Sequence, residues 1–327
     1  MRRERTREDT IKYYVYKTSI QDTESSQTKH NYRKWSEYFA DYCRQNGITT
    51  RTFKHNPMES IEGYRDELIR RGYSAHTIHT YLAPVCKAGN INMKDIEKPQ
   101  RSARTIKRGR DPMRNMRGQQ EEQSDKYKRS VDFQRIVGLR RDEIPRITKS
   151  DLMYDKEKQM YCVHLLKGKG GKEQYQYILP QYNRDIERMY NELKEPGSRF
   201  VDKKEMGPHI DYHKMRAELA KESYKYYCSI LETSEKRNEI IEKLKNHYFN
   251  MNKGALEGTN AAKFRKHYAK FCEQIEKTEP YKLRGEVRAN ALKHGMPVEY
   301  DRLALSCVSV FHLSHWRNDV TAKNYMS

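Results

Sequence analysis

The feature that most constrains this chain is a basic segment near its middle, KPQRSARTIKRGRDPMRNMR, at residues 98–117. It holds eight lysines and arginines against one acid, contains two prolines and shows no apolar periodicity. A helix or strand made from such a segment would have no apolar face to bury against a core. The segment therefore predicts a boundary between two domains.

The rest of the chain is basic as well, with a formal net charge of +20 over 327 residues. Such a surplus repels itself unless a polyanion is present, and phosphate backbones attract lysine and arginine through counterion release. An anionic membrane is the weaker alternative, because the charge is spread along the whole chain. We expect double-stranded DNA as a partner and no membrane. The basic segment is then either a solvated linker or a linker lying along DNA phosphates, through Arg101, Arg104, Lys107, Arg108 and Arg110.

Cysteine spacing and hydropathy exclude several classes of protein. The six cysteines lie far apart without a CxxC pair, which predicts neither a zinc site nor a redox pair. Residues 1–30 hold no apolar run typical of a signal peptide, and no stretch approaches the ~20 apolar residues of a membrane span. We expect reduced thiols, no metal, no cofactor and a cytoplasmic, nucleoid-associated protein.

Helical periodicity dominates the region before the linker. Residues 1–28 predict a polar arm, and aromatic residues recur at helical spacing from 31 until Gly47. A second helix is predicted over 58–72, and a third begins at Ser74, which is a good N-cap. Residues 29–98 therefore predict a small helical DNA-binding domain.

The second domain, residues 123–327 after a linker at 99–122, is predicted to be mostly α-helical with a small β-hairpin or sheet. It opens with a helix, a tight turn at Gly138 and a second helix. The β-branched and aromatic runs 161–166 and 175–179 flank the glycine-rich turn KGKGGKE and predict a hairpin. The pattern after residue 180 is helical.

Four short motifs follow one another in this second domain. Each one alone is common, so only their order and spacing are specific. In chain order they are GLRRDEI with Arg140 and Glu143, KGKGGKE with Lys169, YKLRGEV with Tyr281 and Arg284, and LSHWRNDVTAKNY with His315, Trp316 and Tyr325.

This set resembles the tyrosine recombinase family of phage-integrase and Xer-type enzymes. That family carries an arginine in a GLR-x-x-E turn, a lysine in a hairpin turn, then His-x-Leu-Arg, Leu-Gly-His and a tyrosine. The helices before the linker resemble the family's core-binding (SAM-like) domain. The resemblance covers roughly residues 30–327, apart from an atypical helical stretch at about 197–275.

The resemblance implies a site-specific recombinase, the integrase or transposase of a mobile element or prophage, which cuts and rejoins DNA without metal or ATP. Tyr325 would be the nucleophile of a 3′-phosphotyrosyl intermediate, and Arg140 and Arg284 would grip the attacked phosphate. Lys169 would protonate the leaving oxygen. Further DNA contacts in the same turn would come from Lys167 and Lys172.

Two positions depart from the family pattern. Tyr281 stands where the family has a histidine, and a tyrosine is a poor base near neutral pH. Either His315 or Trp316 could correspond to the histidine of Leu-Gly-His, and the spacing to Tyr325 is compatible with both assignments. Glu143 is expected to orient a site residue or cap the arginine's helix. Only two residues follow Tyr325, so we expect either that another element makes the contact between subunits or that the chain is naturally short or truncated.

The resemblance implies a dimer on DNA that works as a tetramer, with an accessory DNA-bending protein as an optional partner. Two alternatives remain. A degenerate recombinase would only bind DNA, which the tyrosine at position 281 favours. An enzyme like the type IB topoisomerases would share the chemistry but reseal the same strand.

Overall fold

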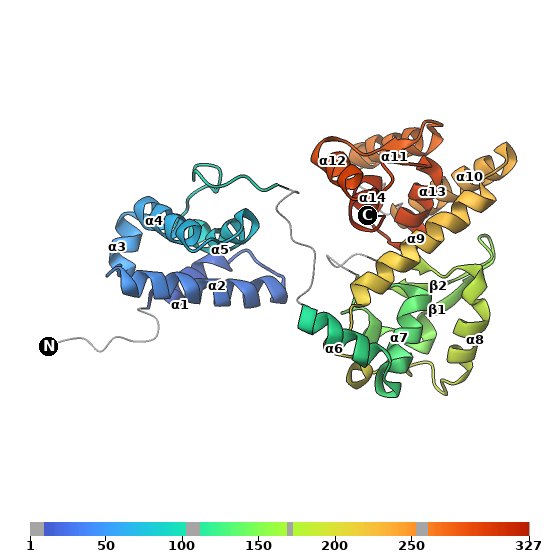
Figure 1. The fold of residues 1–327 in the computed structure, drawn as a ribbon, viewed down its shortest axis with the longest axis horizontal. Helices are drawn as coiled ribbons and strands as arrows, with labels where there is room; N and C mark the ends of the chain where they lie inside the picture. The colour runs from blue at the N-terminus through green and yellow to red at the C-terminus, as the bar shows by residue number, and fades with distance from the viewer. Residues whose placement is uncertain (1–9, 103–111, 169–172, 253–260, 327) are drawn as a thin grey trace. The chain divides into compact units, whose positions relative to one another are not determined.

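The computed structural model describes residues 10–102, 112–168, 173–252 and 261–326, and the chain separates into two compact units, residues 1–107 and 108–327 (Figure 1). The described residues are mostly helical, with a three-stranded antiparallel sheet and a pair of two-residue strands. This confirms the predicted fold class. Within these residues, no helix combines the length and the apolar character that crossing a membrane requires.

The first unit is a small helical domain. Phe39 is fully buried at its centre, with its ring 5.3 Å from that of Phe53 and 5.1 Å from that of Tyr64. Ser74 caps the fifth helix as predicted, because its Oγ accepts a hydrogen bond from Thr77 N at 3.2 Å. The helices are α1 (Ile11–Ser19), α2 (Ser26–Gln45), α3 (Thr50–His55), α4 (Pro57–Arg70) and α5 (Ala75–Ala88).

The prediction of a polar arm over residues 1–28 is wrong for its second half. Residues 11–19 form α1, and α2 begins at Ser26 rather than near residue 31. Val15 is fully buried in the core of the first unit. A single buried valine among polar neighbours does not produce an apolar periodicity from which a helix could be predicted, although Thr10 and Ser25 do supply N-caps.

The second unit begins with helices packed beside the antiparallel sheet. Its strands β1 (Leu152–Asp155), β2 (Met160–Leu165) and β3 (Gln174–Tyr177) lie in the order β1-β2-β3. The β2–β3 hairpin confirms the strands predicted around the glycine-rich turn, and it pairs Leu165 with Gln174. The helices are α6 (Pro112–Glu122), α7 (Asp125–Val137) and α8 (Asn183–Asn191).

Two predictions for this part are wrong. Residues 112–122, assigned to the linker, form α6, and a Cβ on Gly118 would lie 2.7 Å from His209 O, so the helix packs closely against that loop. The second helix expected after Gly138 is only a short 3-10 turn, Ile144–Arg146. Pro145 lacks an N–H and so cannot donate a hydrogen bond back to the turn at Arg140–Glu143, which keeps that turn from continuing as an α-helix.

The remaining elements form the other half of the second unit. The helix α9 contributes Met215 to the core beside the sheet and Ala220 and Tyr227 to the core of this half, so it links the two (Figure 1). A π-helical turn, Val308–His312, follows α13. In order these elements are α9 (Tyr212–Ile230), α10 (Ser234–Asn252), α11 (Ala261–Glu276), β4 (Tyr281–Lys282), α12 (Gly285–Lys293), β5 (Glu299–Tyr300), α13 (Arg302–Cys307) and α14 (Asn318–Asn324).

Candidate active site

Tyr325 directly follows α14 and is only 7% exposed. Its ring centroid lies 5.7 Å from that of His315 and 5.4 Å from that of His213. The guanidinium carbon of Arg216 lies 5.8 Å from the same ring. Two histidines and an arginine, from α9 and from the loop before α14, therefore surround this tyrosine.

Arg216 is almost completely buried, at 1% exposure. Its Nη1 donates to Gly138 O and, at 3.1 Å, to Gln176 Oε1, while Nη2 donates to Leu313 O at 2.8 Å. These acceptors are neutral, so the hydrogen bonds hold the guanidinium without neutralising its charge. Burial lowers the pKa of Arg216, an effect that the neighbouring Tyr325 opposes, yet an arginine stays protonated in a folded protein.

Two buried polar atoms beside Tyr325 lack a hydrogen-bond partner within the described part of the chain. They are Nε of Arg216 and Nε2 of His315. A buried polar group without a partner costs about 1–3 kcal/mol, so it calls for an explanation. A ligand with acceptor oxygens placed between them would satisfy both groups.

His315 is held in a neutral form. Burial, together with the charges of Arg216 and Arg140, lowers the pKa of His315 to about 3. Its backbone N donates to Ser309 O at 3.1 Å, and its Nδ1 lies 3.4 Å from Ser309 Oγ. With the serine hydroxyl donating to Nδ1, the ring proton lies on Nε2, the atom that has no partner.

Arg140 lies in a tight turn directly after α7. Gly138 ends that helix with φ +65°, and a Cβ there would lie 2.6 Å from Leu219 Cδ2 of α9. A glycine at this position allows the turn to approach α9 closely. In addition to burial, the charge of Arg140 lowers the pKa of both Arg216 and His315, so the turn brings a second guanidinium to the site.

Glu143 pairs with Arg140. This carboxylate is 3% exposed, and it accepts hydrogen bonds from Arg140 N at 3.0 Å and from Arg140 Nη1 at 2.9 Å. Gln174 Nε2 donates to the same carboxylate at 3.2 Å. These three donors offset the free-energy cost of removing the carboxylate from water, and the carboxylate in turn restrains the arginine side chain.

The hairpin turn begins next to this network. Lys169 and Lys172 lie outside the described residues, so their predicted roles stay predictions. Lys167 is exposed, and its carbonyl accepts a hydrogen bond from Arg146 Nη2 at 2.8 Å. Gly168 packs directly against the side chain of Gln174, which itself contacts the Arg140–Glu143 pair.

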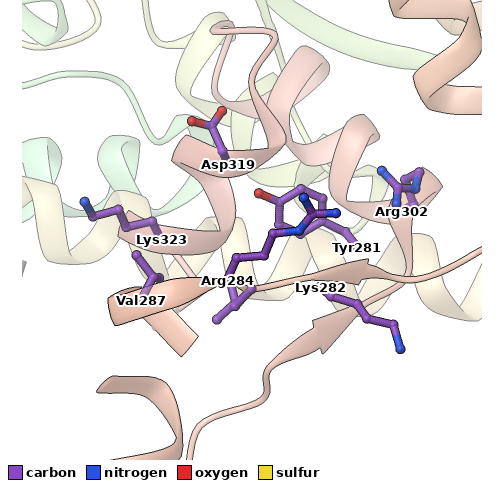
Figure 2. A pocket seen from close by; sticks show the side chains of 8 residues that line it. Tyr281, Lys282, Arg284, Val287, Arg302, Asp319 and Lys323 are labelled. Atoms are coloured by element: carbon purple, nitrogen blue, oxygen red, sulfur yellow. The ribbon is translucent and has the colours of Figure 1, made fainter. Parts of the chain in front are cut away.

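Tyr281 and Arg284 have different surroundings from those the motifs predict. They line an open cleft of about 460 Å³ beside α14 and β4 (Figure 2). The Arg302 guanidinium carbon lies 5.7 Å from the Tyr281 ring, and burial raises the pKa of Tyr281. The other lining residues are Lys282, Leu283, Val287, Asp319 and Lys323. The structure thus groups Arg140, His315 and Tyr325 together, and groups Tyr281 and Arg284 elsewhere.

The sequence reasoning missed His213 and Arg216, although a signal for them was present. Residues 212–216 read YHKMR, which is a His-x-x-Arg pattern with methionine where the resembled family has leucine. YKLR matched the leucine and the arginine but lacked the histidine. The leucine favoured YKLR, and nothing in the sequence indicated that two residues of α9 would lie beside Tyr325.

The remaining predicted residues are only partly described. Arg101 is exposed at the end of the first unit, and Trp316 contacts α10 and α11. Arg104, Lys107, Arg108 and Arg110 lie outside the described residues. Among the residues that are described, no cluster of three or more histidine, cysteine, aspartate or glutamate side chains could hold a metal ion.

Comparisons with known proteins add little. No family model and no curated protein matches the sequence. Among solved structures the chain is similar to XerA recombinase, with 14% sequence identity, a TM-score of 0.21 and coverage of 87% of this chain and 97% of that chain. A likeness at this TM-score carries no weight, so function has to follow from the site itself.

Proposed function

We propose that this protein is a site-specific recombinase that cuts and rejoins double-stranded DNA through a covalent link to Tyr325. One observation carries the proposal: the buried Arg216 and the partly buried His315 each leave a buried polar nitrogen without a partner beside this tyrosine. A tetrahedral phosphate offers acceptor oxygens in several directions. It suits a site with two guanidiniums and a neutral imidazole donor.

The first chemical step is a transesterification. Tyr325 Oη attacks the phosphorus of a DNA phosphodiester, a new P–O bond forms to the tyrosine, and the bond from phosphorus to the 5′-oxygen breaks. The phenol loses its proton, and the leaving 5′-oxygen takes one. Because the phosphotyrosyl bond keeps the energy of the phosphodiester, a 5′-hydroxyl can reverse the step without ATP.

The charged groups act on the phosphate in its transition state. The non-bridging oxygens gain negative charge as Tyr325 attacks, and Arg216 and Arg140 are fixed in place before the reaction. A preorganised guanidinium needs no rearrangement when that charge develops, so it stabilises the transition state more than the ground state. Nε2 of the neutral His315 donates to one of the same oxygens.

Proton transfers need two further groups. We assign the role of receiving the phenol proton to His213, whose ring centroid lies 5.4 Å from that of Tyr325. The sequence motif proposes Lys169 as the acid that protonates the leaving oxygen. Tyr281 and Arg284 take no part in these steps, so the tyrosine at position 281 no longer argues for a degenerate DNA-binding protein.

The wider setting follows from charge and from the family resemblance. The net charge of +20 suits a protein that follows phosphate backbones, so binding should weaken steeply as salt rises. We include in the proposal the DNA-bound dimer, the tetramer that carries out recombination and the cytoplasmic, nucleoid-associated location.

The test is a covalent-trap assay without Mg²⁺. Nicked duplexes tiled across the DNA that flanks the gene are incubated with the full chain and resolved in SDS. We expect a protein–DNA adduct that mass spectrometry maps to Tyr325 and that Tyr325→Phe abolishes without loss of DNA binding. Tight, specific binding with no adduct would instead identify a protein that only binds DNA, and an adduct at another residue would move the nucleophile.

A further inference from the structure

The loop Ser314–Trp316, which carries His315 into the candidate site, has an unusual backbone. Ser314 has φ +50° and Trp316 has φ +56°, in the left-handed region that residues other than glycine rarely adopt. Such conformations each cost of order 1–3 kcal/mol and persist where the surroundings hold them. On one side, Ser314 Oγ donates to Tyr175 O at 2.8 Å.

On the other side, the ring of Trp316 is held by aromatic residues of α10 and α11. His247 stacks on it at 5.4 Å with an interplanar angle of 20°. Tyr248 meets it edge-on at 5.0 Å, and Phe271 meets it edge-on at 5.7 Å. Edge-to-face and offset pairs of this kind each contribute about 0.5–1.5 kcal/mol beyond the area that they bury.

The helices that provide these contacts are themselves tied together. Lys245 of α10 and Glu276 of α11 form a salt bridge of 2.8 Å, and Leu244 and Ile275 are buried in the core of this half of the unit. His247 is 7% exposed, and burial lowers its pKa to about 3, so a neutral imidazole stacks on the indole. The surroundings of Trp316 are therefore built from two long helices that pack against each other.

We propose that α10 and α11 are a positioning device for His315, and that Trp316 is the residue through which they act. His315 and Trp316 are consecutive in the chain, yet one ring contacts Tyr325 and the other is packed among α10 and α11. Fixing the indole fixes the strained loop, and the loop fixes the direction of His315 Nε2. This role rests on the proposed function of the site.

The proposal assigns a role to a region that the sequence set apart as atypical, residues 197–275. It also gives different roles to the two residues that could each have corresponded to the histidine of the Leu-Gly-His motif. His315 contacts the reacting tyrosine, whereas Trp316 is a positioning residue. A displaced donor would lose much of its effect, because a misplacement of about 1 Å can slow catalysis roughly 10²-fold.

The test compares Trp316→Ala and Trp316→Phe in the full chain with a nicked DNA substrate. We expect Trp316→Ala to slow adduct formation at saturating DNA by about tenfold or more, with an unchanged Kd for DNA. Trp316→Phe should recover most of the rate, because a phenyl ring can still stack on His247. The matched control is Phe200→Leu, which removes a buried ring stacked at 5.0 Å on Phe133 in the other core; it should stay within about twofold of wild type.

A second readout needs no cleavage. In the free protein, NMR should find His315 neutral down to the pH of unfolding, because it is buried and faces Arg216, Arg140, Arg317 and Asp319. In Trp316→Ala it should titrate closer to the ordinary value of about 6.5. If wild type forms no adduct, the proposed function fails while this titration still decides the positioning role. An unchanged titration, or a loss of DNA affinity in place of rate, would overturn the role and make Trp316 a direct DNA contact.

Discussion

The surroundings of Tyr325 and the cleft around Tyr281 use the same kinds of side chain in opposite physical settings. Both lie next to α14 and combine a tyrosine with arginines. Arg216 is buried and held by three neutral acceptors, whereas Arg284 is exposed at the edge of an open cleft. A guanidinium held away from water acts strongly on a nearby phosphate, and an exposed one is screened by solvent and salt. A motif therefore marks a residue type, and burial decides what the residue can do.

The largest expected difference between the two regions is in their arginines. Arg216→Lys removes the planar fork, and we expect adduct formation to slow about 10²–10³-fold because the developing phosphate charge loses a fixed partner. Arg284→Lys should stay within about twofold. The measurement is the single-turnover rate on a nicked duplex, with thermal unfolding to verify that both variants fold. The reverse ranking would restore YKLR as the catalytic motif.

The next difference separates His213 from Tyr281. His213→Gln keeps a polar side chain of similar size but cannot accept the phenol proton, and we expect cleavage to slow roughly 10²-fold. Tyr281→Phe should change the rate by less than about twofold. Both are measured as pH–rate profiles between pH 6 and 9. Equal losses in the two variants would mean that the cleft contributes to the chemistry.

A smaller effect is expected from the carboxylates that pair with arginines in each region. Glu143→Gln weakens the buried contact that orients Arg140, so we expect cleavage to fall roughly tenfold. Asp319→Asn breaks an exposed pair with Arg317, at 2.6 Å with both side chains more than half exposed, and should have little effect. Adduct rates and DNA affinities measured side by side distinguish the two. A strong defect in Asp319→Asn alone would contradict this comparison.

The smallest expected effect is the dependence of the free energy of unfolding on pH. Burial lowers the pKa of His247, His312 and His315 to about 3, while no histidine among the described residues lines the cleft around Tyr281. An unfolded histidine takes up a proton near pH 6.5, so between about pH 3 and 6.5 the unfolded state binds more protons. The stabilisation is therefore complete above pH 6.5 and declines as the pH falls.

Urea unfolding at pH 7.5, 6.0 and 5.0 tests this sign. The free energy of unfolding should fall as the pH falls, by at most about 1.4 kcal/mol per pH unit for each histidine, and the urea midpoint should fall with it. His247→Phe keeps an aromatic ring against Trp316 without a titrating group, so its midpoint should depend less on pH. A wild-type midpoint that is constant over this range would contradict the buried, neutral state of these histidines.

Local patterns predicted the parts of the fold that depend on neighbours in the chain. Ser74 caps a helix, the glycine-rich turn joins two strands, and Gly138 ends α7 just before Arg140. Each of these depends on a few consecutive residues whose turn or capping chemistry has few alternatives. The helix α1 was missed because its buried face amounts to little more than Val15.

The sequence alone determined the order of the motifs, the Arg140–Glu143 turn and Tyr325 near the end of the chain. Only the tertiary structure decided which arginine and histidine join that tyrosine. The hydrogen bond from Arg216 to Leu313 O spans 97 positions, and no local spacing can encode such a contact. The packing of α9 against the turn after α7 buries Arg216, whereas Arg284 lies in another part of the unit and stays exposed. Close packing between segments that are distant in the sequence determines which charges are removed from water.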